Sequence, residues 1–122
     1  MQYTRLYADD AGESHFEDVT VEFQEMDYAP PSPPMGLSEM MKATQTGFLL
    51  ASLDWKGEVW HPVSVRQFMV VVAGRVAATV SDGNTREFGM GAVLLLEDTH
   101  GKGHSTEVLG NENGVVAVIH LE

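Results

Sequence analysis

The sequence predicts an all-β fold in which short strands stack as a sandwich or close into a barrel. Apolar and polar residues alternate with a period of two in VTVEF at 19–23, as they do in a half-buried strand. The other apolar runs are short and rich in strand-forming residues, and turn signals separate them. No segment carries a convincing helical repeat of ten residues, so we expect strands and turns rather than helices.

Further strands are expected after 19–23. The Asp82-Gly83 pair supplies the positive φ that a tight hairpin needs, which places a turn between the expected strands 75–81 and 85–89. The stretch NENG at 111–114 joins the last two. The segment LSEMMKA at 37–43 is short and fits either a helix or a strand. The expected strands are 47–55, 67–74, 75–81, 85–89, 91–98, 105–110 and 114–122.

The stretch APPSPP at 29–34 cannot join a central strand, because proline lacks the N–H that a sheet needs. We expect it to run extended along a surface or an edge. It is too short to separate two domains, and 122 residues suit a single one. We therefore expect one domain, 1–122, with N-terminal strands and a proline-rich arm in 1–36 and a barrel in 37–122.

The composition excludes several kinds of partner. The chain carries 18 acidic and 7 basic residues, a formal net charge of −11, with no basic stripe. Such a surface repels nucleic acid and anionic membranes. There is no cysteine, so disulfides and thiolate metal sites are excluded. The apolar runs are too short to span a bilayer, and the first residues lack the basic and apolar pattern of a signal peptide, so we expect a cytoplasmic protein.

Residues 57–104 resemble the two-motif pattern of cupins, in particular small single-domain bacterial cupins. In the first motif, Gly74 lies seven residues after Gln67, which places His61 and Val63 at the two histidine positions. In the second motif, Gly91 is the opening glycine, Glu97 takes the proline position, and His100 and His104 follow in DTHGKGH. The family's spacing puts its last ligand at Lys102, two residues before His104. The resemblance implies a cupin-type double-stranded β-helix, or jelly-roll, barrel.

Cupins include metal-dependent dioxygenases, isomerases, sugar epimerases and binding modules, so the resemblance alone selects no reaction. Two interpretations of the motif stay open. In one, His61, Gln67 and His104 form a reduced ligand set for iron, manganese, nickel or zinc, although Val63 cannot donate and Gln67 is a weak donor. In the other, no metal is bound, and a pocket histidine transfers protons as in an isomerase, epimerase or lyase.

The metal-free interpretation leads, and it assigns roles to seven residues. On one strand, residues 61, 63, 65 and 67 share a face, so His61 and Gln67 should look into one cavity over an apolar floor. His61 is the expected catalytic group, assisted by His104 or His100, and Gln67 orients the substrate. Trp60 and Met69 shape the wall, and Lys102 is placed to meet an anion. With so few cations, an uncharged or singly charged small organic molecule suits the pocket better than a nucleotide.

Alternatives without catalysis remain for the same residues. The domain could be a non-catalytic binding or sensor module, and His61 a hydrogen-bonded rim histidine without a role. Trp55 and Trp60 more often serve packing than ligand stacking. His15 has acidic neighbours, Glu13, Glu17 and Asp18, that raise its pKa if they lie close in space.

We also expect a homodimer. The N-terminal strands and the proline arm have edges and faces that need something to pair with or to cover them.

Overall fold

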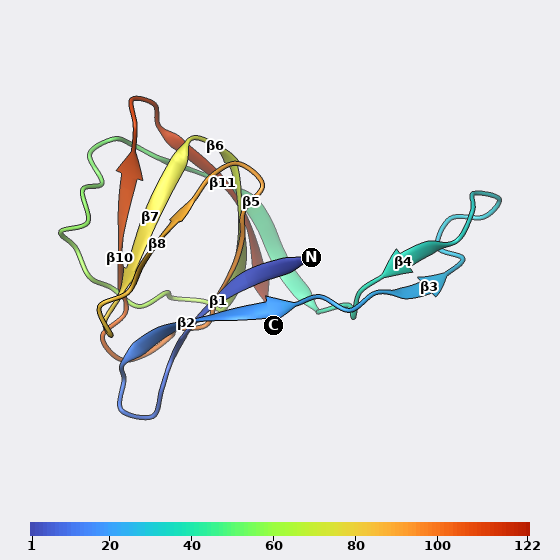
Figure 1. Ribbon diagram of the computed structural model, residues 1–122, viewed down its shortest axis with the longest axis horizontal. Coiled ribbons are helices and arrows are strands. Elements are labelled where there is room, and N and C mark those ends of the chain that lie inside the picture. Colours follow the sequence, from blue (N-terminus) through green and yellow to red (C-terminus); the bar gives the residue numbers. More distant parts are fainter.

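The structure, a computed structural model, describes residues 1–122 and contains β-strands and no helix (Figure 1). The all-β prediction is therefore confirmed. No helix that could cross a membrane is present. The strands are β1 (Gln2–Ala8), β2 (Ser14–Thr20), β3 (Gln24–Met26), β4 (Met35–Leu37), β5 (Ala43–Ala51), β6 (Gln67–Ala73), β7 (Arg75–Val80), β8 (Thr85–Phe88), β9 (Val93–Leu96), β10 (His104–Leu109) and β11 (Gly114–Leu121).

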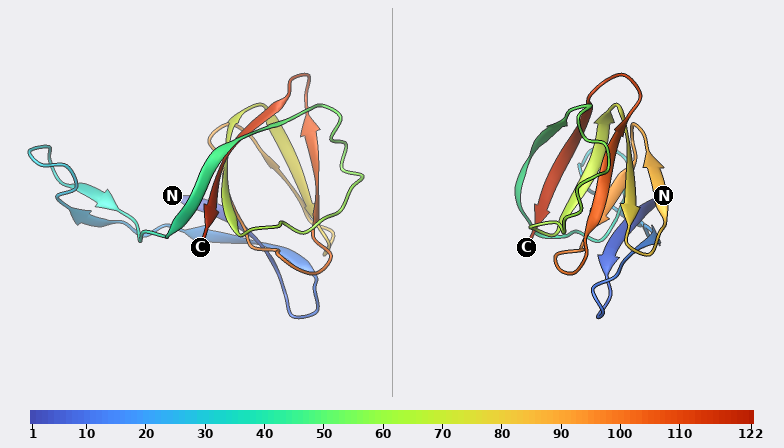
Figure 2. Two further views of the ribbon diagram at one scale, coloured as in Figure 1. Left: turned by 180° about the vertical axis from the view of Figure 1, so that it is seen from behind. Right: turned by 90° about the vertical axis from the view of Figure 1, so that its left-hand side faces the viewer.

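Two sheets face each other and form the barrel (Figures 1 and 2). The large sheet has the order β2-β1-β9-β6-β11-β5, and the small sheet has the order β10-β7-β8. Isolated bridges from Lys56 to Glu107 and from His61 to His104 add the segment 52–66 to the free edge of β10. All strand pairs are antiparallel except β1 with β9.

The path of the chain between the sheets defines the fold class. From β5 onward the chain visits the large sheet, then the small sheet through 52–66, then β6 in the large sheet and β7 and β8 in the small one. It returns to the large sheet in β9, crosses to β10, and ends in β11 of the large sheet. This interleaving of two antiparallel sheets is the jelly-roll arrangement that the sequence motifs predicted.

The core lies between the sheets because every second residue of a strand points inward. On β6, Val71 is buried while its neighbour Val72 is exposed. The small sheet contributes Val76, Ala78, Val80 and Val108, and the large sheet contributes Leu6, Leu94, Leu96, Val116 and Val118.

The strand expected at 19–23 is present only at its start, because β2 ends at Thr20, and the strand expected across 61–67 is wrong. Residues 61–67 do not form one strand, because the chain bends at 64 and 65. His61 pairs with His104 beside the small sheet, whereas Gln67 begins β6 in the large sheet. The alternation of inward and outward residues is therefore interrupted between them.

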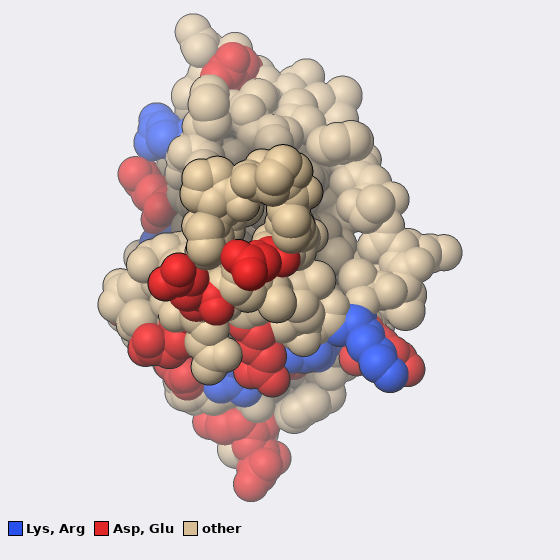
Figure 3. Space-filling model, turned by 90° about the vertical axis from the view of Figure 1, so that its right-hand side faces the viewer, with Lys and Arg blue, Asp and Glu red and all other residues tan.

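The segment 37–43 contains no helix: Leu37 ends β4 and Ala43 begins β5. The two strands β3 and β4 pair only with each other and form a hairpin that projects from the barrel (Figures 1 and 2). The prolines of APPSPP lie in the exposed turn at its tip. Seen from this side, the surface carries more acidic than basic side chains (Figure 3).

Candidate functional site

A cavity of about 260 Å³ lies between the two sheets. Its wall is almost entirely apolar, and its three polar residues are His61, His104 and Thr106. The apolar lining residues are Leu6, Leu49, Leu50, Ala51, Trp55, Met69, Val71, Val76, Ala78, Leu94, Leu96 and Val116. The cavity is open on one side, since its lining residues Leu49, Leu50 and Trp55 are exposed. A concave apolar site with a few convergent polar groups is the usual form of a small-molecule site.

The two histidines lie opposite each other on neighbouring segments. The backbone N–H of His61 donates to the carbonyl of His104 at 3.1 Å, and that of His104 donates to the carbonyl of His61 at 3.0 Å. Residues paired in this way direct their side chains to the same face. The two ring centroids are accordingly 5.2 Å apart, and Trp55 meets the His61 ring edge to face at 6.1 Å.

A glycine makes this pairing possible. Gly103 has a φ of +72°, and a Cβ there would lie 2.1 Å from the carbonyl carbon of His61. Any side chain at this position would therefore push His61 away from His104.

The Nδ1 atom of each ring faces an oxygen that accepts a hydrogen bond. His61 Nδ1 donates to the carbonyl oxygen of Pro62 at 3.0 Å. His104 Nδ1 donates to Oδ2 of Asp98 at 2.6 Å. Both Nδ1 atoms therefore carry the proton in the neutral rings, and both Nε2 atoms have a free lone pair. His61 Nε2 is buried and has no hydrogen-bond partner.

Asp98 is a site residue to which sequence reasoning gave no definite place. It follows β9, is fully buried, and holds the buried ring of His104, while its second oxygen, Oδ1, has no partner. A buried carboxylate that accepts from an imidazole N–H fixes the orientation of the ring. The signal in the sequence was a carboxylate between an apolar strand and a histidine, which does not by itself reveal burial.

Of the residues predicted for the site, His61, His104 and Met69 line the cavity. Gln67 is buried, but its Nε2 donates to the carbonyl of Val65 at 2.9 Å and it does not line the cavity. Trp60 and His100 are exposed and lie outside the lining. Sequence reasoning missed Thr106 and the cavity-facing residues of β5, since their inward direction depends on which strands pair.

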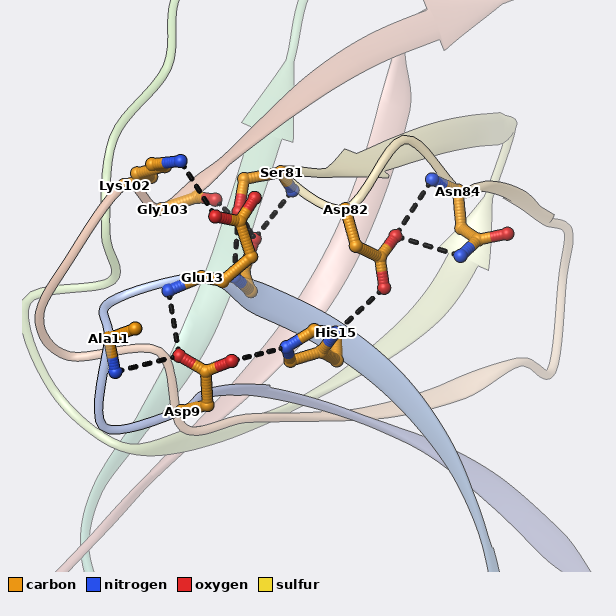
Figure 4. A network of polar contacts seen from close by, with 10 residues as sticks. Asp9, Ala11, Glu13, His15, Ser81, Asp82, Asn84, Lys102 and Gly103 are labelled. Atoms are coloured by element: carbon orange, nitrogen blue, oxygen red, sulfur yellow. Dashed lines mark hydrogen bonds and ion pairs between the residues drawn. The ribbon is translucent and has the colours of Figure 1, made fainter.

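Lys102 also lies outside the cavity. Its Nζ pairs with Oε2 of Glu13 at 2.6 Å, in a polar network that ties the loop after β1 to the loop before β10 (Figure 4). In this network, the hydrogen bonds that the His15 ring donates to Asp9 and then to Asp82 raise the pKa of His15. The expected direction of the His15 shift is confirmed, but its partners are Asp9 and Asp82 rather than the neighbours in sequence.

Arg5 and Arg66 are also engaged outside the cavity, since both pair with Glu97. Burial raises the pKa of Glu97, but the hydrogen bonds and charges of Arg5 and Arg66 outweigh this effect and hold that pKa below its usual range. No lysine or arginine lines the cavity, so its wall offers no counter-ion to an anionic ligand.

The residues at the cavity do not fit a metal site. No three His, Cys, Asp or Glu side chains are grouped so that they could hold an ion. Asp98 is directed to His104 Nδ1, and the Gln67 amide is directed to Val65, which leaves two imidazoles. A first-row metal site usually has three or more good donors, so we derive no chemistry through a metal.

The comparisons with known proteins bear on the fold. No protein-family model and no curated protein matches the sequence. One similar solved structure, described as an ethanolamine utilization protein Q of Salmonella typhimurium LT2, has 16% identity and a TM-score of 0.46 over 99% of this chain and 95% of that one. Another, the cupin domain of Schizosaccharomyces pombe Cnp3, has 12% identity and a TM-score of 0.48 over 99% and 84%.

The strand order of the two sheets decides the fold class. The chain has a jelly-roll fold, the class of fold to which cupins belong. At such low identities the two similar structures indicate nothing about the ligand or the reaction of this jelly-roll domain.

Proposed function

We propose that this jelly-roll domain binds a small, mainly apolar organic molecule inside its barrel, with His61 and His104 as the polar contacts. One observation carries the proposal: an apolar cavity of about 260 Å³ is lined by His61, whose buried Nε2 atom has no hydrogen-bond partner. Buried polar atoms in proteins are nearly always paired, and an unpaired one calls for a partner. A bound molecule that reaches His61 Nε2 supplies it.

The size and charge of the cavity narrow the ligand class. An apolar cavity of about 150 Å³ admits benzene, so this larger one admits a substituted ring or a branched chain of similar size. Since no cation lines the wall, an uncharged molecule suits it better than a phosphate or a carboxylate.

A thermal-shift screen of uncharged metabolites tests the proposal. A ligand at 100 times its dissociation constant adds about 2.7 kcal/mol to the free energy of unfolding. We expect at least one compound to raise the melting temperature of the wild-type protein and not that of Val76→Phe, in which a larger side chain fills the cavity. If no compound shifts the wild type, the proposal is wrong.

The buried Asp98–His104 pair favours a second candidate function, proton transfer within the bound molecule. His104 Nε2 takes a proton from the ligand, Asp98 stabilises the resulting imidazolium, and return of the proton to another atom of the ligand gives an isomer. The test is to incubate the compounds that bind in deuterated buffer and to follow their C–H signals by NMR. We expect deuterium to enter one position with the wild type and not with His104→Gln; exchange that is equal in both contradicts this candidate.

Metal analysis addresses the remaining alternative from the sequence motifs. We expect protein purified without chelator to contain less than stoichiometric iron, manganese, nickel or zinc. Near-stoichiometric metal that disappears in His61→Ala would instead support a metal-dependent enzyme with His61, Gln67 and His104 as ligands.

A further inference from the structure

The tautomers of the two histidines determine which hydrogen bonds the cavity can make. The carbonyl oxygen of Pro62 and the carboxylate of Asp98 can only accept, so both Nδ1 atoms donate and both Nε2 atoms are acceptors in the neutral rings. Of these, His61 Nε2 is buried without a partner. The histidine pair thus offers lone pairs, not protons, to a ligand.

The rest of the wall does not reverse this polarity. The other polar lining residue is Thr106, whose hydroxyl can either donate or accept, and all remaining lining side chains are apolar. A carboxylate or a ketone oxygen next to His61 would meet another lone pair. An O–H or N–H group there would make the missing hydrogen bond.

We propose that the ligand is an uncharged molecule with a hydrogen-bond donor, a phenol or alcohol, that donates to His61 Nε2 while its apolar part fills the barrel. This inference rests on the proposed binding function and adds the chemical class of the ligand. Selection arises because a site built to accept one hydrogen bond leaves a polar atom unpaired when the donor is missing.

The test compares p-cresol with p-xylene, which differ in one hydroxyl in place of a methyl group. Both are titrated by NMR into the wild type, His61→Phe and the control Trp60→Phe, at pH 8.5 so that ordinary imidazoles are neutral. Because p-xylene gains more from leaving water, the informative quantity is the change in each dissociation constant on substitution. We expect His61→Phe to weaken p-cresol about tenfold, the worth of one net hydrogen bond, and to change p-xylene less than about twofold. Trp60→Phe, outside the cavity, should change neither.

The possible results separate the two proposals. If both probes bind and His61→Phe affects them equally, the donor inference is wrong and the binding cavity stands. If neither probe binds the wild type at millimolar concentration, both proposals fail for molecules of this class.

A second measurement uses the wild-type protein alone, so its result does not depend on whether a variant folds. Long-range ¹H–¹⁵N NMR spectra of the wild type report the tautomer of each neutral histidine. We expect the proton on Nδ1 in both His61 and His104. A proton on Nε2 of His61 would overturn the inference, because that nitrogen would then be a donor.

Discussion

Asp98 supports the candidate site without lining it. Its carboxylate is fully buried and accepts from His104 Nδ1. Charge-assisted hydrogen bonds of this kind are stronger than neutral ones. Removal of one partner leaves the other buried group unpaired, which lowers the stability of the folded protein. The orientation of His104 therefore depends on a residue behind it.

We predict that Asp98→Ala lowers the free energy of unfolding by about 1–3 kcal/mol, since it leaves a buried N–H without an acceptor. Asp98→Asn keeps an acceptor oxygen and should cost less. Urea denaturation measures both, with the exposed Asp54→Ala as the control, expected within about 0.5 kcal/mol of wild type. Equal stability of Asp98→Ala and Asp54→Ala would mean that the hydrogen bond contributes nothing.

His15 gives the protein a pH-dependent contribution to stability. Its pKa is raised in the folded state by Asp9 and Asp82, so folding favours the protonated ring. The sign follows from linkage: the contribution is complete below the ordinary histidine pKa of about 6.5 and disappears as the pH rises through the higher folded value. At alkaline pH the His15 ring loses its charge, and its contacts with Asp9 and Asp82 become weaker.

We predict that the melting temperature of His15→Gln falls furthest below that of the wild type at pH 5.5–6.5, and that the difference shrinks toward pH 9.5. Thermal unfolding across this range measures it, with His100→Gln, on the exposed loop, as a control whose difference stays constant. A difference for His15→Gln that is equally constant would show that the ion pairs do not change the His15 pKa.

The sequence predicted the direction of the His15 shift but not its cause. Glu13, Glu17 and Asp18 are neighbours in sequence, whereas Asp82 lies 67 residues away and approaches only when the loop after β1 meets the turn after β7. Asp98 was hidden for the same reason, because its burial depends on contacts between elements far apart in the chain.

At the level of elements, regular strands were predictable and the irregular segment 52–66 was not. The short apolar run at 114–122 matches the observed β11, in which buried and partly buried residues alternate over most of the strand. Between 52 and 66 the chain crosses from one sheet to the other, makes two isolated bridges and bends. The alternation expected across 61–67 fails there, and for that reason His61 lines the cavity while Gln67 does not.

The junction between this segment and β10 depends on Gly103. We predict that Gly103→Ala costs at least about 2 kcal/mol more than Gly110→Ala. Both residues have a positive φ, +72° and +78°, so both substitutions carry the penalty of about 1–2 kcal/mol for a left-handed residue with a side chain. The methyl group at Gly110 would meet nothing within 4 Å, whereas at Gly103 it would overlap the backbone of His61. Equal losses in urea denaturation would show that the His61 segment moves away without cost.

For the whole molecule, the sequence predicted two sheets with an apolar interior but not the cavity inside it. Inward-facing residues follow from strand periodicity, since β11 buries Gly114, Val116 and Val118 and leaves the residues between them partly exposed. The volume of the cavity depends instead on the distance and angle between β5, Trp55 and the small sheet. The alternation of residues along a strand does not specify these quantities. The position of the projecting hairpin likewise depends on where the barrel ends.

The homodimer expected from the sequence stays a prediction, and the surface of the molecule makes it specific. Phe48 on β5 and Val72 on β6 are exposed on the outer face of the large sheet, on either side of β11. Large exposed apolar patches usually mark interfaces. Two chains with a formal charge of −11 repel each other, however, and salt screens this repulsion. We therefore expect sedimentation velocity at micromolar concentration to show a dimer whose dissociation constant falls as the salt concentration is raised.

Two variants test which surface forms the dimer. Phe48→Lys should give monomer even though it makes the net charge less negative, because it removes apolar contact. Val59→Lys, the same charge change at an exposed residue beside the small sheet, should leave the dimer intact. A wild type that sediments only as monomer at both salt concentrations would remove the prediction.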